Sequence, residues 1–147
     1  MSDLKTVLEQ ARVLRDLGHE ELIALGESLE LRRLSDGETV FRTGDEATEL
    51  LLVAEGALRL ERAGTPLGSL ASGEMLGGAS LVAIGHRECD AIAEGEARLL
   101  ALSRESYLRM RGDFPTVALA LQEGVLRELA QVLRGALEQA AESVAGS

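Results

Sequence analysis

The stretch from Leu31 to Leu102 constrains the fold most, because short apolar segments alternate there with glycine-containing turns. In several of these segments apolar and polar residues alternate, which is typical of strands with one buried face. The strands predicted from this pattern are residues 31–34, 39–42, 49–54, 57–62, 66–70, 88–93 and 97–102. About seven short strands at this spacing predict a sandwich or a closed β-roll.

Helical periodicity flanks this region on both sides. Apolar residues recur at helical spacing over residues 4–17, and a second short helix is predicted to bring Leu22, Leu25 and Leu29 to one face. After a capping Ser103, a short helix is predicted to run from residue 104 to residue 111, with Gly112 as its stop. A long helix is predicted from Phe114-Pro115 to about Ala141.

Composition restricts the partners and the compartment. The formal net charge is −10, and a uniformly acidic surface repels nucleic acid and anionic lipid. No apolar run approaches the ~20 residues that span a bilayer, and the N-terminus lacks the features of a signal peptide. Cys89 is the only cysteine, which excludes an internal disulfide and predicts a structural thiol in a reducing cytoplasm. We therefore expect a cytoplasmic protein that binds neither DNA nor membranes.

A glycine-rich stretch, residues 73–91, is the candidate site. Gly77, Gly78, Ala79 and Ser80 allow a tight turn into a short helix whose free N–H groups converge and favour an anion. Arg87, beyond a turn at Gly85, is placed to close over the same anion with its planar guanidinium. The alternative interpretation is a glycine-rich loop with a surface arginine.

The long C-terminal helix carries two apolar rows. One row is Val125, Leu129, Val132 and Ala136, and the other is Leu119, Leu126, Leu133 and Ala140. Two rows exceed what a single core contact needs, so one is expected to pack on the roll and the other on a second copy of the chain. Residues 116–141 are therefore the predicted dimerisation helix of a homodimer. Its contact residues are expected to be Leu119, Val125, Leu126, Leu129, Val132 and Leu133.

The order of these features resembles the cyclic nucleotide-binding domain family over residues 14–137. Residues 14–60, with turns at Gly44-Asp45 and Glu55-Gly56, look like the first helix and strands of the family. Residues 77–87 look like its phosphate-binding cassette, and residues 97–110 look like its last strand and the helix that follows.

The resemblance implies an α+β fold that is mainly β, a double-stranded β-helix (jelly-roll) with N-terminal helices and a long C-terminal helix. The implied parts are N-terminal helices at 1–30, a roll at 31–103 that contains the cassette-like stretch 73–91, and C-terminal helices at 104–147. We call residues 73–91 the cassette.

The resemblance also assigns roles within the cassette. Gly77 matches the family glycine, and Arg87 matches the arginine that pairs with the cyclic phosphate. Gly78 stands where the family usually has a glutamate that holds the ribose 2′-hydroxyl. Glu88 replaces a small or hydroxyl residue, and Asp90 follows it. Each carboxylate would repel a phosphodiester by about 1 kcal/mol at ~4 Å in water, and Arg87 could pair with Glu88 or Asp90 instead.

Three functions from different classes follow. The preferred hypothesis is a non-enzymatic regulatory module, with weak or lost nucleotide binding and no other cofactor, that acts as a dimer on an unidentified protein partner. The alternative is a functional sensor of cyclic AMP or cyclic GMP with an altered pocket. Family members that bind DNA carry a helix-turn-helix after the long helix, and the sequence ends at Ser147, where that domain would begin.

The third function, an enzyme on a cupin-type roll, is disfavoured. Metal-dependent cupins need clustered histidines, and the two histidines, His19 and His86, lie far apart in the sequence. No catalytic constellation is apparent, so neither catalytic residues nor a metal are expected.

Overall fold

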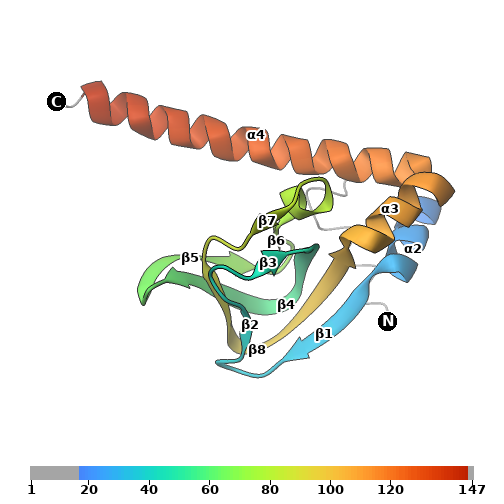
Figure 1. The fold of residues 1–147 in the computed structure, drawn as a ribbon, viewed down its shortest axis with the longest axis horizontal. Coiled ribbons are helices and arrows are strands. Elements are labelled where there is room, and N and C mark those ends of the chain that lie inside the picture. The colour runs from blue at the N-terminus through green and yellow to red at the C-terminus, as the bar shows by residue number, and fades with distance from the viewer. Residues whose placement is uncertain (1–16, 146–147) are drawn as a thin grey trace.

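The computed structural model describes residues 17–145, so the helix predicted at residues 4–17 lies almost wholly outside the described part. The helices are α2 (His19–Ser28), the short 3-10 helix η2 (Gly78–Leu81), α3 (Arg104–Asp113) and α4 (Pro115–Ala145). The strands are β1 (Glu30–Leu34), β2 (Thr39–Phe41), β3 (Glu46–Ala47), β4 (Glu49–Arg62), β5 (Thr65–Ala71), β6 (Met75–Leu76), β7 (Gly85–His86) and β8 (Asp90–Ser103). Figure 1 shows a mainly antiparallel roll with a long C-terminal helix, which confirms the predicted fold class.

Two long strands form the centre of the roll. β4 and β8 pair antiparallel from Glu49 opposite Ser103 to Glu61 opposite Asp90. β1 pairs with the outer edge of β8 and β5 with the outer edge of β4, while β2 and β6 pair with β8 and β4 respectively. β3 and β7 form a separate two-stranded sheet. The two-residue strands β3, β6 and β7 were not predicted, because two residues carry no periodicity.

The predicted breaks within β4 and β8 are wrong. Residues 49–54 and 57–62 belong to one strand, and so do residues 90–93 and 97–102. The pairing register shifts on both sides of Glu55, next to Gly56, which adopts φ +81°. A bulge thus absorbs the glycine, and the ladder continues past it with a bend. A strand was also predicted to begin at Glu88, whereas β8 begins at Asp90.

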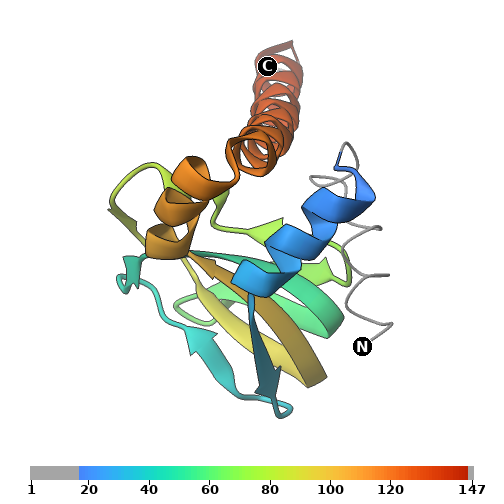
Figure 2. The ribbon, with the colours of Figure 1, turned by 90° about the vertical axis from the view of Figure 1, so that its right-hand side faces the viewer.

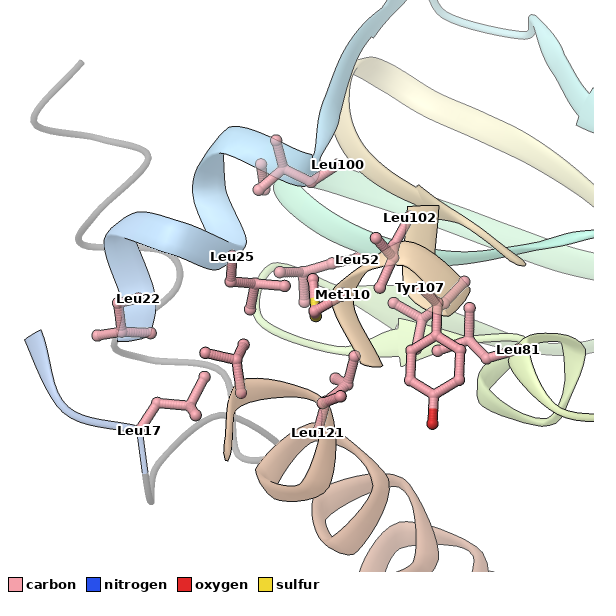
Figure 3. Packing of buried hydrophobic residues seen from close by; sticks show 14 residues of the cluster. Leu17, Leu22, Leu25, Leu52, Leu81, Leu100, Leu102, Tyr107, Met110 and Leu121 are labelled. Carbon is pink, nitrogen blue, oxygen red and sulfur yellow. The ribbon is translucent and has the colours of Figure 1, made fainter. Parts of the chain in front are cut away.

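Both faces of the central strands are buried, as their apolar sequence indicated. On one face Leu52, Leu100 and Leu102 pack with α2, α3 and α4, and Figure 3 shows this cluster around Leu25, Met110 and Leu121. On the other face Leu51, Leu58 and Leu99 pack inside the roll. Successive strand residues point to opposite faces, so β4 and β8 separate the two cores.

The ends of the C-terminal helices differ from the prediction. Ser103 caps α3 as predicted, since its hydroxyl accepts a hydrogen bond from the Ser106 N–H at 3.0 Å. Gly112 does not stop α3, which ends at Asp113. α4 continues to Ala145, beyond the predicted end.

Of the two predicted apolar rows of α4, only Val125 packs against the buried core. The buried residues of α4 are Val117, Ala118, Leu121 and Gly124. They lie in the first three turns, because α2 and α3 adjoin α4 only there. Further along, the helix extends away from the roll (Figures 1 and 2). Of the two predicted rows, Leu119, Leu126, Leu129, Val132 and Leu133 are exposed.

We expect Gly56→Ala to destabilise the protein more than Gly64→Ala. Both glycines have φ near +80°, which costs an alanine about 1–2 kcal/mol. A Cβ at Gly56 would also lie 2.5 Å from the carbonyl oxygen of Glu96, whereas one at Gly64 meets nothing within 4 Å. Urea unfolding followed by far-UV circular dichroism should therefore show a further loss of about 1–3 kcal/mol for Gly56→Ala. Equal losses for the two variants would contradict the bulge.

Candidate functional site

The cassette forms one side of a hollow of about 330 Å³. Its lining comes from the turn before η2, from η2 itself, from the segment through β7 to Cys89, from β2 and from α4. The lining residues are Phe41, Ala47, Leu76, Gly77, Gly78, Ala79, Ser80, Ala83, Ile84, Gly85, His86, Arg87, Glu88, Cys89 and Leu129. We call this hollow the anion pocket, because its one arginine, Arg87, determines its chemistry.

Arg87 is buried, with only 8% of its surface exposed to solvent. Its Nη2 donates a hydrogen bond to the Glu49 carbonyl oxygen at 2.9 Å, and its guanidinium lies 4.4 Å from the centre of the Phe41 ring. Burial lowers the pKa of Arg87, although a guanidinium keeps its charge in proteins. Within the described residues no carboxylate forms an ion pair with it. A buried cation with one backbone hydrogen bond has donors left for an anion.

The acidic side chain with the largest effect on the charge of Arg87, that of Glu49, is already paired with another arginine. The carboxylate of Glu49 accepts a bidentate pair of hydrogen bonds from Arg32, one of them at 2.7 Å. These hydrogen bonds raise the pKa of Arg32. Arg87 therefore bonds to the carbonyl oxygen of Glu49, whereas the carboxylate of Glu49 pairs with Arg32 on β1.

Gly77 permits the close approach of the guanidinium. It adopts φ +84°, and a Cβ there would lie 2.5 Å from Nη1 of Arg87. The same Cβ would lie 3.4 Å from the Ser80 Oγ, and Ser80 is buried. The structure therefore brings Gly77, Ser80 and Arg87 together at one point, and their binding of an anion stays a prediction.

Gly78 has a different neighbour, the helix α4. A Cβ at Gly78 would lie 2.6 Å from Cγ1 and 3.1 Å from Cγ2 of Val125. Val125 was predicted to lie on the dimer face, and Leu129, predicted there too, also lines the anion pocket. α4 therefore fills the space into which a side chain at residue 78 would point.

The acidic residues after Arg87 do not pair with it. Asp90 accepts hydrogen bonds from the Thr43 N–H at 2.7 Å and from the Thr43 hydroxyl at 2.9 Å. These bonds lower the pKa of Asp90 and direct its carboxylate toward Thr43. The suggestion that Arg87 pairs with Asp90 is wrong. Glu88 is exposed and lines the pocket, and its opposition to an anion stays a prediction.

Cys89 also lines the anion pocket and is partly buried. Burial, followed by the charges of Asp90 and Glu88, raises the pKa of its thiol. A raised pKa keeps the thiol protonated and unreactive at neutral pH, which agrees with a packing role.

Sequence analysis missed Arg104, the first residue of α3. Its Nε donates to the Ser80 carbonyl at 2.7 Å, and its Nη2 donates to the carbonyls of Ala83 at 2.9 Å and Ala47 at 3.0 Å. The guanidinium thereby joins η2 and β3 to the start of α3. No local pattern points to these bonds, because their acceptors are backbone atoms at least 21 residues away.

Comparison with known proteins agrees with this geometry. The family model described as "Cyclic nucleotide-binding domain" matches residues 31–113. The Cyclic AMP receptor protein of Thermus thermophilus is 40% identical over 106 residues, which make up 67% of this chain and 48% of that protein. The chain thus spans about half the length of this curated relative.

Solved structures show the same fold. The N-terminal domain of a transcriptional regulator from Streptomyces coelicolor is similar with a TM-score of 0.78 and 29% identity, covering 88% of this chain and 94% of that one. The catabolite activator protein of Thermus thermophilus gives a TM-score of 0.78 and 32% identity, covering 90% of this chain and 63% of that one.

Two further findings concern residues 17–145. None of the helices there combines the length and the apolar character that crossing a bilayer requires. The same residues contain no group of three His, Cys, Asp or Glu side chains that could hold a metal ion. The absence of a metal in the whole chain stays a prediction.

We expect Arg104→Ala to lower the free energy of unfolding by about 2–4 kcal/mol, because three carbonyl oxygens lose a charged donor. The matched control is Arg109→Ala on the same helix, where an exposed guanidinium bonds only the Ser106 hydroxyl. Its effect should stay within about 0.5 kcal/mol. Urea unfolding measures both variants, and equal effects would show that Arg104 does not hold the cassette.

Proposed function

We propose, from the premise that this chain belongs to the cyclic nucleotide-binding domain family, that it is a non-enzymatic regulatory module with a pocket changed on its ribose side. The pocket keeps the groups for a phosphate and lacks those for a ribose, so it binds cyclic nucleotides weakly. The module acts as a homodimer on a protein partner, without contacting DNA or a membrane, in the cytoplasm. The contact between Gly78 and Val125 is the observation that carries the proposal.

The phosphate side of the pocket supports this assignment. Arg87 has a buried guanidinium with donors left for an anion, and the buried Ser80 adjoins the same point. Gly77 leaves the space that such an anion contact needs. A relative of this chain bears the name Cyclic AMP receptor protein, which agrees with a phosphate as the group recognised here.

The ribose side lacks its usual partner. The family resemblance places a glutamate at residue 78, where this chain has glycine. A lost charged hydrogen bond costs on the order of 1.5–3 kcal/mol, which corresponds to ~10–100-fold in affinity. Val125 occupies the adjoining space, so the glycine also serves the packing of α4.

A functional sensor of cyclic AMP or cyclic GMP is the second candidate, and two observations favour it. Asp90 is held by Thr43 and does not neutralise Arg87. Glu49 is held by Arg32. Of the carboxylates suggested to act against the ligand, only the exposed Glu88 then remains beside the pocket.

The dimer is proposed from the apolar surface of α4. The exposed fractions of Leu126, Val132 and Leu133 are 64%, 70% and 60%. Leu119, Leu129 and Leu137 extend the same surface. A contiguous apolar surface of this kind marks an interaction site, and a parallel second helix would cover it.

We expect cyclic AMP and cyclic GMP to bind the wild type no more tightly than about millimolar. Gly78→Glu combined with Val125→Ala should bind ~10–100-fold more tightly, because it restores the carboxylate and removes both methyl groups that it would meet. Val125→Ala alone is the control and should show no gain. Isothermal titration calorimetry measures all three proteins. Micromolar binding of either cyclic nucleotide by the wild type would refute the proposal and favour the functional sensor.

We expect Leu126→Glu combined with Val132→Glu to convert a dimer into a folded monomer of about the chain mass of 15.6 kDa, since buried unpaired carboxylates oppose association. The control adds two carboxylates at exposed positions outside the apolar surface, Gln131→Glu with Ala145→Glu. Sedimentation equilibrium should show that the control remains a dimer. A monomeric wild type at micromolar concentration would refute this interface.

A further inference from the structure

We infer that the ligand of this pocket is an amphipathic carboxylate, with its head group on Arg87 and an aliphatic body along α4. This inference rests on the proposed function, because it names the ligand class that takes the place of a cyclic nucleotide. It comes from a second hollow beside the anion pocket and from the side chains that line both.

The second hollow is an apolar groove of about 380 Å³ between η2, α3 and α4. Its lining residues are Gly78, Ala79, Leu81, Val82, Tyr107, Arg111, Gln122, Val125, Leu126 and Leu129. Gly78, Ala79 and Leu129 also line the anion pocket. The two hollows therefore share three lining residues without polar side chains, and each has the size of a small-molecule site.

The groove offers few polar side chains to a sugar or a base, because seven of its ten lining residues are apolar or glycine. Gln122 Nε2 donates a hydrogen bond to the Tyr107 hydroxyl, so part of the hydrogen-bonding capacity of both residues is already used. The remaining polar side chain, Arg111, is exposed. A ribose or a base buried there would lose more hydrogen bonds to water than these few groups could replace, whereas an aliphatic chain loses none.

The apolar side chains beside the two hollows are unusually exposed for their size. The exposed fractions of Val82 and Ile84, which follow η2, are 69% and 81%, and that of Leu129 on α4 is 47%. An aliphatic body lying between them would remove this surface from water, which is favourable. It would also bridge η2 and α4 and so connect the pocket to the proposed dimer helix.

The charge of the pocket favours a single negative charge. Arg87 is the one arginine in the lining of the anion pocket, which contains no lysine, and Glu88 adds a negative charge to its wall. A carboxylate matches the planar donors of one guanidinium. A dianionic phosphate monoester would bring a second charge that this lining does not neutralise.

The first experiment compares chain lengths and head groups on the wild-type protein. Calorimetric titrations use hexanoate, octanoate and decanoate below their micellar concentrations, with octanol and octylammonium as controls. Affinity should rise about fourfold per methylene, as expected for buried CH₂ groups. Octanoate should bind at least ~10-fold more tightly than either control, because only the carboxylate pairs with a guanidinium.

The second experiment tests the two halves of the site separately. Arg87→Gln should weaken the affinity for octanoate at least ~10-fold and leave the affinity for octanol unchanged. Arg59→Gln, which lies outside both hollows, is the control. Leu129→Ser should reduce the gain in affinity per methylene. Leu67→Ser, at an exposed position on β5, is the control. Because Leu126 and Leu129 also belong to the proposed dimer surface, sedimentation accompanies each titration.

The inference is overturned if octanol or octylammonium binds the wild type as tightly as octanoate, or if decanoate fails to bind at millimolar concentration. The head-group comparison needs only the wild type, so it decides even if Arg87→Gln unfolds. Micromolar binding of cyclic AMP would refute the proposed function whatever the carboxylates do. Failure of the carboxylates alone would refute this inference and leave the weak-nucleotide proposal standing.

Discussion

The antiparallel pairing of β4 with β8 is the interaction on which the rest of the structure depends. Its two strands are apolar on both faces, so they hold the helices on one side and the interior of the roll on the other. The ladder ends where Glu49 faces Ser103. The Glu49 carbonyl accepts from Arg87, and Arg104 follows Ser103. One end of one ladder therefore positions Arg87 of the cassette and Arg104, which donates hydrogen bonds to the cassette.

The chemistry of the pocket follows from how these charges are shared. Arg32 neutralises the Glu49 carboxylate, and Thr43 holds Asp90. Arg87 is left buried with a backbone carbonyl and an aromatic face as its partners. A desolvated guanidinium without a carboxylate is stabilised by any anion that reaches it. This arrangement supports the proposal that the pocket keeps its phosphate side although its ribose side has changed.

Helix α4 connects the pocket to the proposed dimer surface. Val125 lies against Gly78 and Leu129 lines the pocket, while Leu126 and Val132 are exposed beside them. Any ligand that shifts the contact between Gly78 and Val125 would move the helix that presents the apolar surface. Under the proposed function, these residues would link occupancy of the pocket to association of the two copies, as regulation by a ligand requires.

The sequence by itself determined most of the strands with their apolar faces, the helix α3 capped by Ser103, and the glycine turn that brings Gly77 close to Ser80. These features rest on local spacing and on the conformations that glycine allows. Only the tertiary structure decided that Gly56 lies in a bulge and that Asp90 accepts hydrogen bonds from Thr43. It also decided that α4 packs through Leu121 and places Val125 against Gly78. Gly78 and Val125 lie far apart in the sequence, and periodicity shows which face of a helix is apolar without showing what covers it.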